Sequence, residues 1–190
     1  MTGASHLKAS SSSIERIAAS AGASALFCIA TGLIAVIIDA AFHLPLRLPG
    51  HHGLTQMALL VAAACVTRRP WAATLSAASS AAAVAGFAGL GFSPLTPALY
   101  LLSGLAVDGC RLGLRTWRDS VWLLAAAAAL GNSAKAVALW FAGDVVSAHG
   151  ILTLNGFAYS LLSHLAFGGI GGLIAAGLWS ATRKRLRSPD

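Results

Sequence analysis

Six apolar stretches run along the chain, and short polar or basic segments separate them. A membrane-spanning helix needs about 20 predominantly apolar residues. The pattern therefore predicts an all-α, polytopic membrane protein with six transmembrane helices, over residues 18–42, 54–67, 71–90, 95–110, 120–142 and 151–182. The second and fourth stretches are shorter than a full span, so they need flanking residues or a locally thinner bilayer.

The composition supports a membrane-embedded chain. Of the 190 residues, 57% are hydrophobic and 10% are charged, whereas soluble domains contain roughly 25% charged residues. Alanine and glycine dominate, which favours close approach of helices through small residues. The three cysteines lie inside apolar stretches without short spacing, so they indicate neither a disulfide framework nor a zinc site.

The basic residues lie on one side of the predicted topology. Eleven of the 13 Lys and Arg residues precede the first helix, follow the sixth, or lie in the connections after the second and fourth. This positive-inside pattern places both termini in the cytoplasm of a bacterial cell, and it accounts for the net charge of +7 without nucleic acid as a partner. We divide the chain into a polar cytoplasmic leader (1–17), a six-helix membrane domain (18–182) and a basic cytoplasmic tail (183–190).

The connection between the first two helices, HLPLRLPGHHGLTQ at residues 43–56, gathers two prolines, two glycines and three histidines. Proline and glycine together favour a stiff turn. We interpret this segment as a lid over an outward-facing site, and its lid residues are His43, Arg47, His51 and His52. Solvated interfacial histidines and a metal site are alternatives. No carboxylate or cysteine of the loop completes a metal ligand set, although Asp39 is near in sequence, and we assign no metal.

Lys135 is the clearest ionisable residue within a predicted span, and such residues are expensive in a bilayer. Asn132 lies one turn earlier on the same helix face. In one interpretation Lys135 pairs with Asp39 near the outer end of the first helix. In the other, Lys135 and Asn132 face a cavity and hold an anionic or carbonyl group of a ligand. The two are compatible if Asp39 orients Lys135.

Other polar residues of the outer half could contribute to the same site. Gln56 opens the second helix, where unpaired N–H groups face the outer surface. In the sixth helix Asn155 and Tyr159 share a face, and His164 lies deeper, where a lone imidazole is more often a hydrogen-bonded packing element than a ligand. The predicted substrate-binding residues are therefore Gln56, Asn132, Lys135, Asn155, Tyr159 and His164.

The cytoplasmic half of the first helix carries small residues four positions apart, which include Ala19/Ala23 and Ala21/Ala25. Such a smooth face indicates either tight packing within the chain or docking of another membrane subunit.

The cytoplasmic ends of the other helices suggest structural roles. We interpret Asp108 as a partner of Arg111 and Arg115. An interfacial aromatic belt is predicted from Trp71, Trp117, Trp122 and Trp179.

Catalysis finds little support. The chain contains neither H-E-x-x-H nor the nucleotide-binding G-x-x-x-x-G-K, and Ser24 lies too far along the membrane normal from His164 to act with it. We therefore expect a non-enzymatic protein without a cofactor. Two functions are favoured: a transport component that binds a small polar molecule, or a non-catalytic scaffold that assembles membrane complexes. A third, an intramembrane enzyme, would need His164 near a nucleophile or a metal.

The chain resembles the substrate-binding (S) components of energy-coupling factor vitamin transporters over most of residues 18–182. The resemblance rests on six spans, the small-residue steps of the first helix, and the runs LPGHHGLTQMALLVAAA and RRPWAATLSAA. It implies capture of a vitamin or metal beneath an outer lid and docking onto a transmembrane coupling subunit driven by two ATPases. The family's A-x-x-x-A docking step is matched by Ala19/Ala23 and by Ala21/Ala25. The metal-specific branch starts with Met-His, whereas this chain starts with Met-Thr-Gly, so we expect a vitamin-like substrate.

Overall fold

A computed structural model describes residues 21–41, 48–86, 95–113, 116–142 and 154–187. These residues form six α-helices and one 3-10 helix, and none of them is in a strand. The helices are α2 (Ala21–Ala41), α3 (Gly53–Thr67), α4 (Ala72–Gly86), α5 (Thr96–Gly113), η2 (Trp117–Asp119), α6 (Val121–Phe141) and α8 (Leu154–Arg187). Each predicted apolar stretch therefore contains one helix, and the all-α prediction is confirmed.

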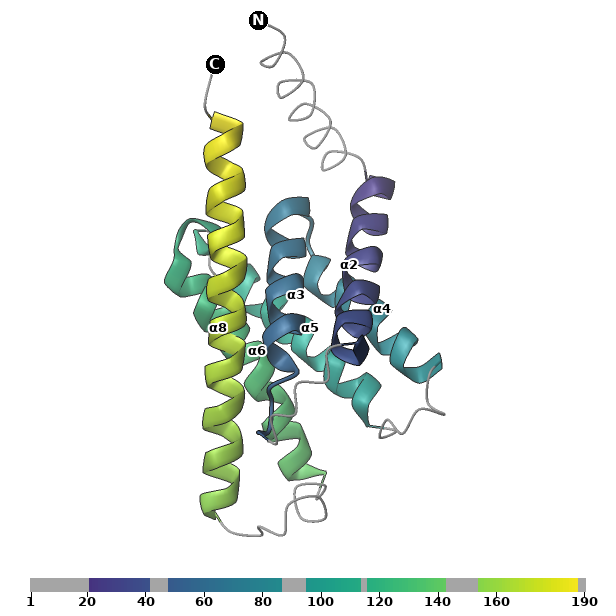
Figure 1. Ribbon diagram of the computed structural model, residues 1–190, viewed down its shortest axis with the longest axis vertical. Coiled ribbons are helices and arrows are strands. Elements are labelled where there is room, and N and C mark those ends of the chain that lie inside the picture. The colour runs from purple at the N-terminus through teal and green to yellow at the C-terminus, as the bar shows by residue number, and fades with distance from the viewer. Residues whose placement is uncertain (1–20, 42–47, 87–94, 114–115, 143–153, 188–190) are drawn as a thin grey trace, which may run out of the picture.

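Successive helices run up and down, so the first residues of α2 and the last of α8 lie at the same end of the molecule (Figure 1). Helix α8 continues to Arg187, through residues that the sequence analysis assigned to a basic tail. Three helices are long and apolar enough to cross a membrane: α2, α6 and residues Gly156–Lys184 of α8. Helices α3 and α4 are apolar but shorter.

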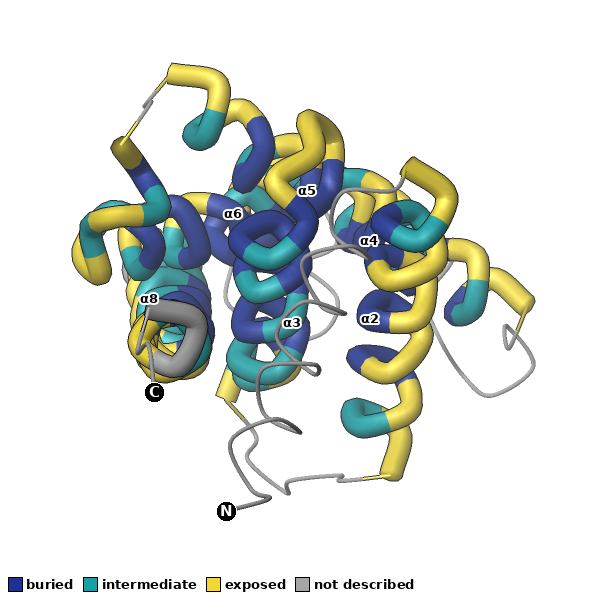
Figure 2. Tube along the Cα trace, turned by 90° about the horizontal axis from the view of Figure 1, so that it is seen from above, coloured by how far each residue is buried: buried dark blue, intermediate teal, exposed yellow. Residues whose placement is uncertain are grey.

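Helix α3 forms the centre of the bundle (Figure 2). It packs against α2 on one side and α8 on the other, while α4 and α5 pair behind it and α6 packs against both α5 and α8. Met57, Val61 and Ala64 of α3 have no exposed surface. A helix that is buried around most of its circumference explains why this short stretch shows no amphipathic pattern.

Glycines on α8 set the spacing of the central helices. A Cβ added at Gly172 would lie 2.7 Å from Ala125 Cα of α6, and one at Gly171 would lie 2.5 Å from the Leu54 carbonyl oxygen of α3. No side chain fits at these distances, so the backbones can approach closely only because glycine is present. The small-residue face predicted from the sequence lies on the first helix, and this face of α8 was not predicted.

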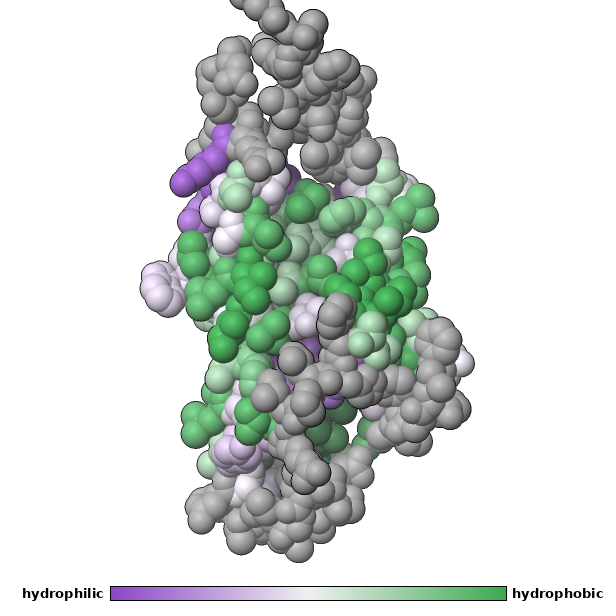
Figure 3. All heavy atoms as spheres, viewed as in Figure 1, coloured by the Kyte–Doolittle hydropathy of each residue, from purple (hydrophilic) through white to green (hydrophobic). Residues whose placement is uncertain are grey.

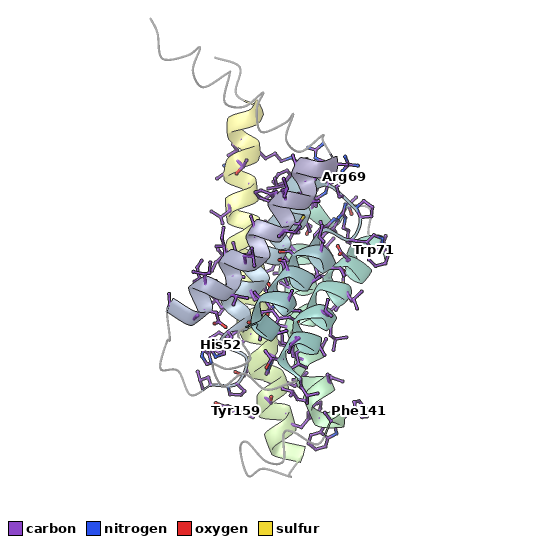
Figure 4. All side chains as sticks on the ribbon, turned by 90° about the vertical axis from the view of Figure 1, so that its right-hand side faces the viewer. His52, Arg69, Trp71, Phe141 and Tyr159 are labelled. Atoms are coloured by element: carbon purple, nitrogen blue, oxygen red, sulfur yellow. The ribbon has the colours of Figure 1, made fainter. Side chains whose placement is uncertain are left out.

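A buried carboxylate holds the helix ends together at the end of the bundle that carries Arg69 and Trp71 (Figure 4). Asp108 of α5 is 1% exposed. It accepts hydrogen bonds from the Thr74 amide at 2.8 Å, the Thr74 hydroxyl at 2.8 Å and the Ala73 amide at 3.4 Å. It therefore satisfies the unpaired first-turn amides of α4 and complements the positive end of that helix.

The predicted pairing of Asp108 with arginines is thus a secondary contact. Arg111 Nη1 lies 4.0 Å from Asp108 Oδ1 and donates a hydrogen bond to the Arg69 carbonyl. Arg115 lies outside the described residues. The closest partners of the carboxylate are backbone amides of another helix, which a charge pattern cannot identify.

The predicted aromatic belt is only half correct. Trp71 and Trp122 are exposed, at 54% and 76%. Trp117 and Trp179 are buried and belong to the main apolar core with residues of α3 and α6. The prediction failed for Trp117 and Trp179 because it considered only where each residue lies along the membrane normal. That position does not determine whether the side chain points toward the core or away from it.

Candidate functional site

A cavity of about 290 Å³ opens at the end of the bundle opposite Asp108, among α2, α3, α5, α6 and α8. Its wall combines apolar and polar side chains, and the polar ones are Asp39, His52, Thr96, Tyr100, Asn132, Lys135 and His164. The segment that precedes α3 contributes Gly50, and α3 itself contributes Gly53. Three of the predicted substrate-binding residues, on two different helices, therefore line one cavity.

Lys135 places a buried cation in this wall. The residue is 8% exposed. Its Nζ donates a hydrogen bond to Gln56 Oε1 of α3 and lies 5.0 Å from the centre of the Tyr100 ring. A carbonyl oxygen and a ring face both attract a cation, but neither neutralises it. Among the described residues, no carboxylate forms an ion pair with Lys135 beside the cavity.

The carboxylate of Asp39 is engaged elsewhere. Its Oδ1 lies 2.5 Å from His52 Nδ1, and its Oδ2 accepts a hydrogen bond from the Tyr100 hydroxyl at 3.4 Å. Among the described residues, the ion pair of Asp39 is with His52 and not with Lys135. The ring of Tyr100 connects the two charges, since it contacts Asp39 through its hydroxyl and Lys135 through its face.

Asn132 fixes the floor of the cavity. It has no exposed surface, and its Nδ2 donates to the His164 carbonyl at 2.9 Å and the Gly50 carbonyl at 3.3 Å. These bonds tie α6 to α8 and to the segment before α3. Asn132 Oδ1 is buried and has no hydrogen-bond partner among the described residues, and the same holds for Gln56 Nε2. Each amide therefore uses one half of its hydrogen-bonding capacity and leaves the other half unused.

Two glycines let the predicted lid segment approach this floor. Gly50 has φ +79°, a left-handed conformation that glycine adopts without strain. A Cβ there would also lie 2.7 Å from the His164 ring, and a Cβ at Gly53 would overlap the Asn132 amide. The sequence analysis assigned these glycines only to a turn. Their second role, close contact with α6 and α8, depends on residues more than 75 positions away.

His164 is oriented by its own helix. It is 5% exposed, and its Nδ1 lies 2.8 Å from the Ser160 carbonyl oxygen. The carbonyl requires a proton on Nδ1, so Nε2 of the neutral ring is an acceptor. Ser163, the preceding residue, donates to the Pro49 carbonyl at 2.6 Å and holds the same segment from the outside.

The other predicted site residues lie apart from the cavity wall. Gln56 is 3% exposed and lies behind Lys135. Tyr159 is 51% exposed and lies farther toward the lower end than His52 (Figure 4). The Asn155 side chain is outside the described residues. The structure thus brings together Asn132, Lys135 and His164, with Gln56 behind them, and leaves Tyr159 outside.

The predicted lid is described in part. His43 and Arg47 lie outside the described residues. His52 lines the cavity, whereas His51 Nδ1 bonds the Leu48 carbonyl at 2.6 Å and its ring lies 3.9 Å from that of His52. Within the described ranges, no three metal-binding side chains cluster together.

Tyr100 is the main site residue that the sequence analysis missed. It is one of only two tyrosines in the chain, and it occurs early in a helix that follows a Pro-containing segment. Its isolation in an apolar stretch was the available signal, since a buried tyrosine hydroxyl usually requires a hydrogen-bond partner.

The residues predicted to dock a partner lie on the first helix. Ala21 is exposed and Ala25 is half-buried, whereas Ala19 is outside the described residues. Ala23 is half-buried. Farther along the same helix, Leu26 and Ile37 are more than 60% exposed, so much of α2 presents apolar surface to its surroundings.

Comparisons with protein-family models, with curated proteins and with solved structures find no match for this chain.

Proposed function

We propose that the chain is a membrane-embedded binding component of a transporter, and that the cavity beside Lys135 captures a small polar molecule. The observation that carries this proposal is the unused acceptor Asn132 Oδ1 of a residue that lines the cavity, which has no hydrogen-bond partner among the described residues. Buried polar atoms are nearly always paired in native proteins. Unpaired atoms around a hollow suit a site whose partner arrives from outside.

The wall specifies the chemistry of the ligand. The Lys135 ammonium attracts a carboxylate, phosphate or carbonyl oxygen. Asn132 Oδ1 and His164 Nε2 accept hydrogen bonds, so they suit an N–H or O–H group on the ligand. Leu99 and Leu139 supply apolar wall, and the Tyr100 ring offers a flat surface. A small, vitamin-like molecule with an acidic or carbonyl group and at least one N–H or O–H group fits this wall, whereas a purely apolar one would leave the polar atoms unpaired.

The membrane arrangement follows from the same pattern. Three helices have the length and apolarity for a span, and a broad band of apolar side chains covers the middle of the molecule (Figure 3). We propose six spans with both termini in the cytoplasm, since the basic residues then share one side. The cavity would face the exterior of the cell, and His52 and the segment before α3 would lie at its mouth.

The energy source lies outside this chain in the proposed scheme. The sequence carries no nucleotide-binding motif, and the resemblance to energy-coupling factor S components suggests a transmembrane coupling subunit and ATPases as partners. The exposed small residues of α2, Ala21 and Gly22, offer a surface where a partner helix could approach closely. The rival function, a scaffold without a ligand, accounts less well for a hollow that is lined by Asn132, whose Oδ1 has no partner among the described residues.

Mass spectrometry of the chain purified in a mild detergent tests the proposal. We expect a small molecule to co-purify and to be released on denaturation. Lys135→Met keeps the length of the side chain and removes the charge, so it should abolish retention of that molecule. Tyr159→Phe serves as the matched control because Tyr159 is a polar residue of α8 outside the cavity. If the wild-type and Lys135→Met proteins retain the same compounds, or neither retains any after expression in rich medium, the scaffold function is favoured.

A further inference from the structure

A second cavity, of about 190 Å³, lies at the opposite end of the molecule, between η2, the start of α6 and the C-terminal part of α8. Hydrophilic side chains gather over this part of α8 (Figure 3). The charged residues around the cavity are Arg118, Asp119, Arg183 and Lys184. Three cations and one carboxylate leave an excess of positive charge.

A buried polar group on a residue that lines this cavity has no partner among the described residues. Trp179 lines the cavity and is 9% exposed. Its indole N–H is buried without a hydrogen-bond acceptor in the part of the chain that the structure describes. An indole N–H can only donate, so an acceptor group on a molecule bound in the cavity would satisfy it.

The cations are incompletely neutralised within the described residues. Asp119 Oδ1 lies 2.6 Å from Arg183 Nη1, and this carboxylate is the only acidic group that lines the cavity. Partial burial lowers the pKa of the Arg118 guanidinium, and the nearby positive charges of Arg68 and Arg111 lower this pKa further. Asp119 acts in the opposite direction but does not cancel these effects. The region therefore has a positive potential that an anion would relieve.

The floor and the rim distinguish the kind of anion. Val121, Leu124 and Ala176 form an apolar floor. Val121 is also 45% exposed, and the next residue, Trp122, is 76% exposed. Both belong to α6, which is long and apolar enough to span a membrane. A free phosphate uses only the charged rim, whereas a lipid also covers the apolar surface with its acyl chains.

We propose that this cavity binds the head group of an anionic phospholipid from the cytoplasmic leaflet. The phosphodiester oxygens accept a hydrogen bond from Trp179 Nε1 and charge-assisted contacts from Arg118, Arg183 and Lys184. Basic pockets between transmembrane helices on the cytoplasmic side are suited to such head groups. This site is separate from the outer cavity and does not depend on the proposed transport function.

Native mass spectrometry of the delipidated chain in detergent tests the proposal, with dioleoylphosphatidylglycerol, dioleoylphosphatidylcholine and inorganic phosphate as separate probes. We expect the anionic lipid to bind about tenfold more tightly than the zwitterionic one. Trp179→Phe removes the N–H and keeps an aromatic ring, and Arg118→Gln removes one charge. Each substitution should weaken binding of the anionic lipid about tenfold and should change binding of the zwitterionic lipid little.

Arg69→Gln is the matched control, because it removes a positive charge at the same end of the molecule without touching the cavity. It should leave the preference for the anionic lipid unchanged. Equal binding of the two lipids, or an unchanged preference in both Trp179→Phe and Arg118→Gln with wild-type melting temperatures, overturns the proposal. Inorganic phosphate that binds alone and displaces the lipid at similar concentration overturns the assignment to a lipid. If either Trp179→Phe or Arg118→Gln fails to fold, the lipid preference of the other variant tests the proposal.

Discussion

Two buried polar clusters occupy opposite ends of this helical bundle, and they differ in how completely their atoms are paired. At the basic end, the Asp108 carboxylate accepts hydrogen bonds from two amides and one hydroxyl at the start of α4. At the other end, Asn132 and Gln56 each bond through one amide atom and leave the other unpaired. Both clusters use residue types that are costly to bury away from water.

The difference separates a structural cluster from a binding site. Both oxygens of the Asp108 carboxylate accept hydrogen bonds within the chain, so this cluster is explained by the fold alone. The Asn132 cluster surrounds a cavity and contains a cation without a carboxylate in direct contact. Removal of a residue from the first cluster should therefore reduce stability alone, whereas removal from the second should reduce ligand binding, with or without a loss of stability. Four substitutions test this contrast, from the largest expected effect to the smallest.

Asp108→Ala should be the most destabilising. It leaves the buried Ala73 amide and the half-buried Thr74 amide and hydroxyl without their acceptor, and at about 1–3 kcal/mol for each unsatisfied donor the total loss should be about 3–5 kcal/mol. Asp108→Asn is the matched control, since its carbonyl oxygen still accepts and the loss should be smaller. Unfolding in detergent by increasing SDS, followed by circular dichroism, measures both. Equal losses for the two variants would contradict the role of the carboxylate as an acceptor of amides.

Gly53→Ala should come next, with a loss of about 1–3 kcal/mol through overpacking. The new methyl overlaps the Asn132 amide and displaces it from the Gly50 and His164 carbonyls. Gly109→Ala provides the control, because a Cβ at that helical position meets nothing within 4 Å. The Gly53 variant should unfold earlier and also lose retained ligand. Stability equal to that of the Gly109 variant would mean that the segment before α3 adjusts freely.

Asn132→Ala should destabilise the fold by about 2 kcal/mol, since each of its two hydrogen bonds contributes about 1 kcal/mol. It also removes the acceptor Oδ1 from the cavity, so affinity for the ligand should fall as well. Asn132→Asp separates the two effects, because it keeps an acceptor toward the cavity and loses the donor to the carbonyls. The same unfolding assay, combined with the amount of co-purified ligand, measures both quantities. Loss of stability without loss of ligand would place the binding site elsewhere.

Lys135→Met should change stability least. Among the described residues, the ammonium bonds an amide oxygen and faces a ring but forms no ion pair. A buried methionine of similar volume should therefore stabilise the fold about as well as the lysine does. Stability should remain within about 1 kcal/mol of the wild type, or increase, while ligand retention disappears. Circular dichroism in SDS and mass spectrometry on the same sample provide the two readings. A destabilisation comparable to that of Asp108→Ala would show that Lys135 is structural and would remove the contrast between the clusters.

The sequence by itself determined the helices and their order. Six apolar stretches of near-membrane length specify six helices because apolar backbone segments satisfy their hydrogen bonds internally as helices. It also identified Lys135, Asn132 and His164 as costly residues to bury, since charge and polarity are properties of single residues and of their place within a stretch.

Only the tertiary structure decided which polar atoms meet. Asp39 bonds His52 and Tyr100 instead of Lys135, and Tyr159 shares a helix with His164 but lies outside the cavity. Such partners depend on the rotation of each helix about its axis, and that rotation is set by packing contacts such as those of Gly171 and Gly172 with α3 and α6. A sequence pattern places a residue along its helix, but the direction in which the residue points is fixed only when all the helices pack together.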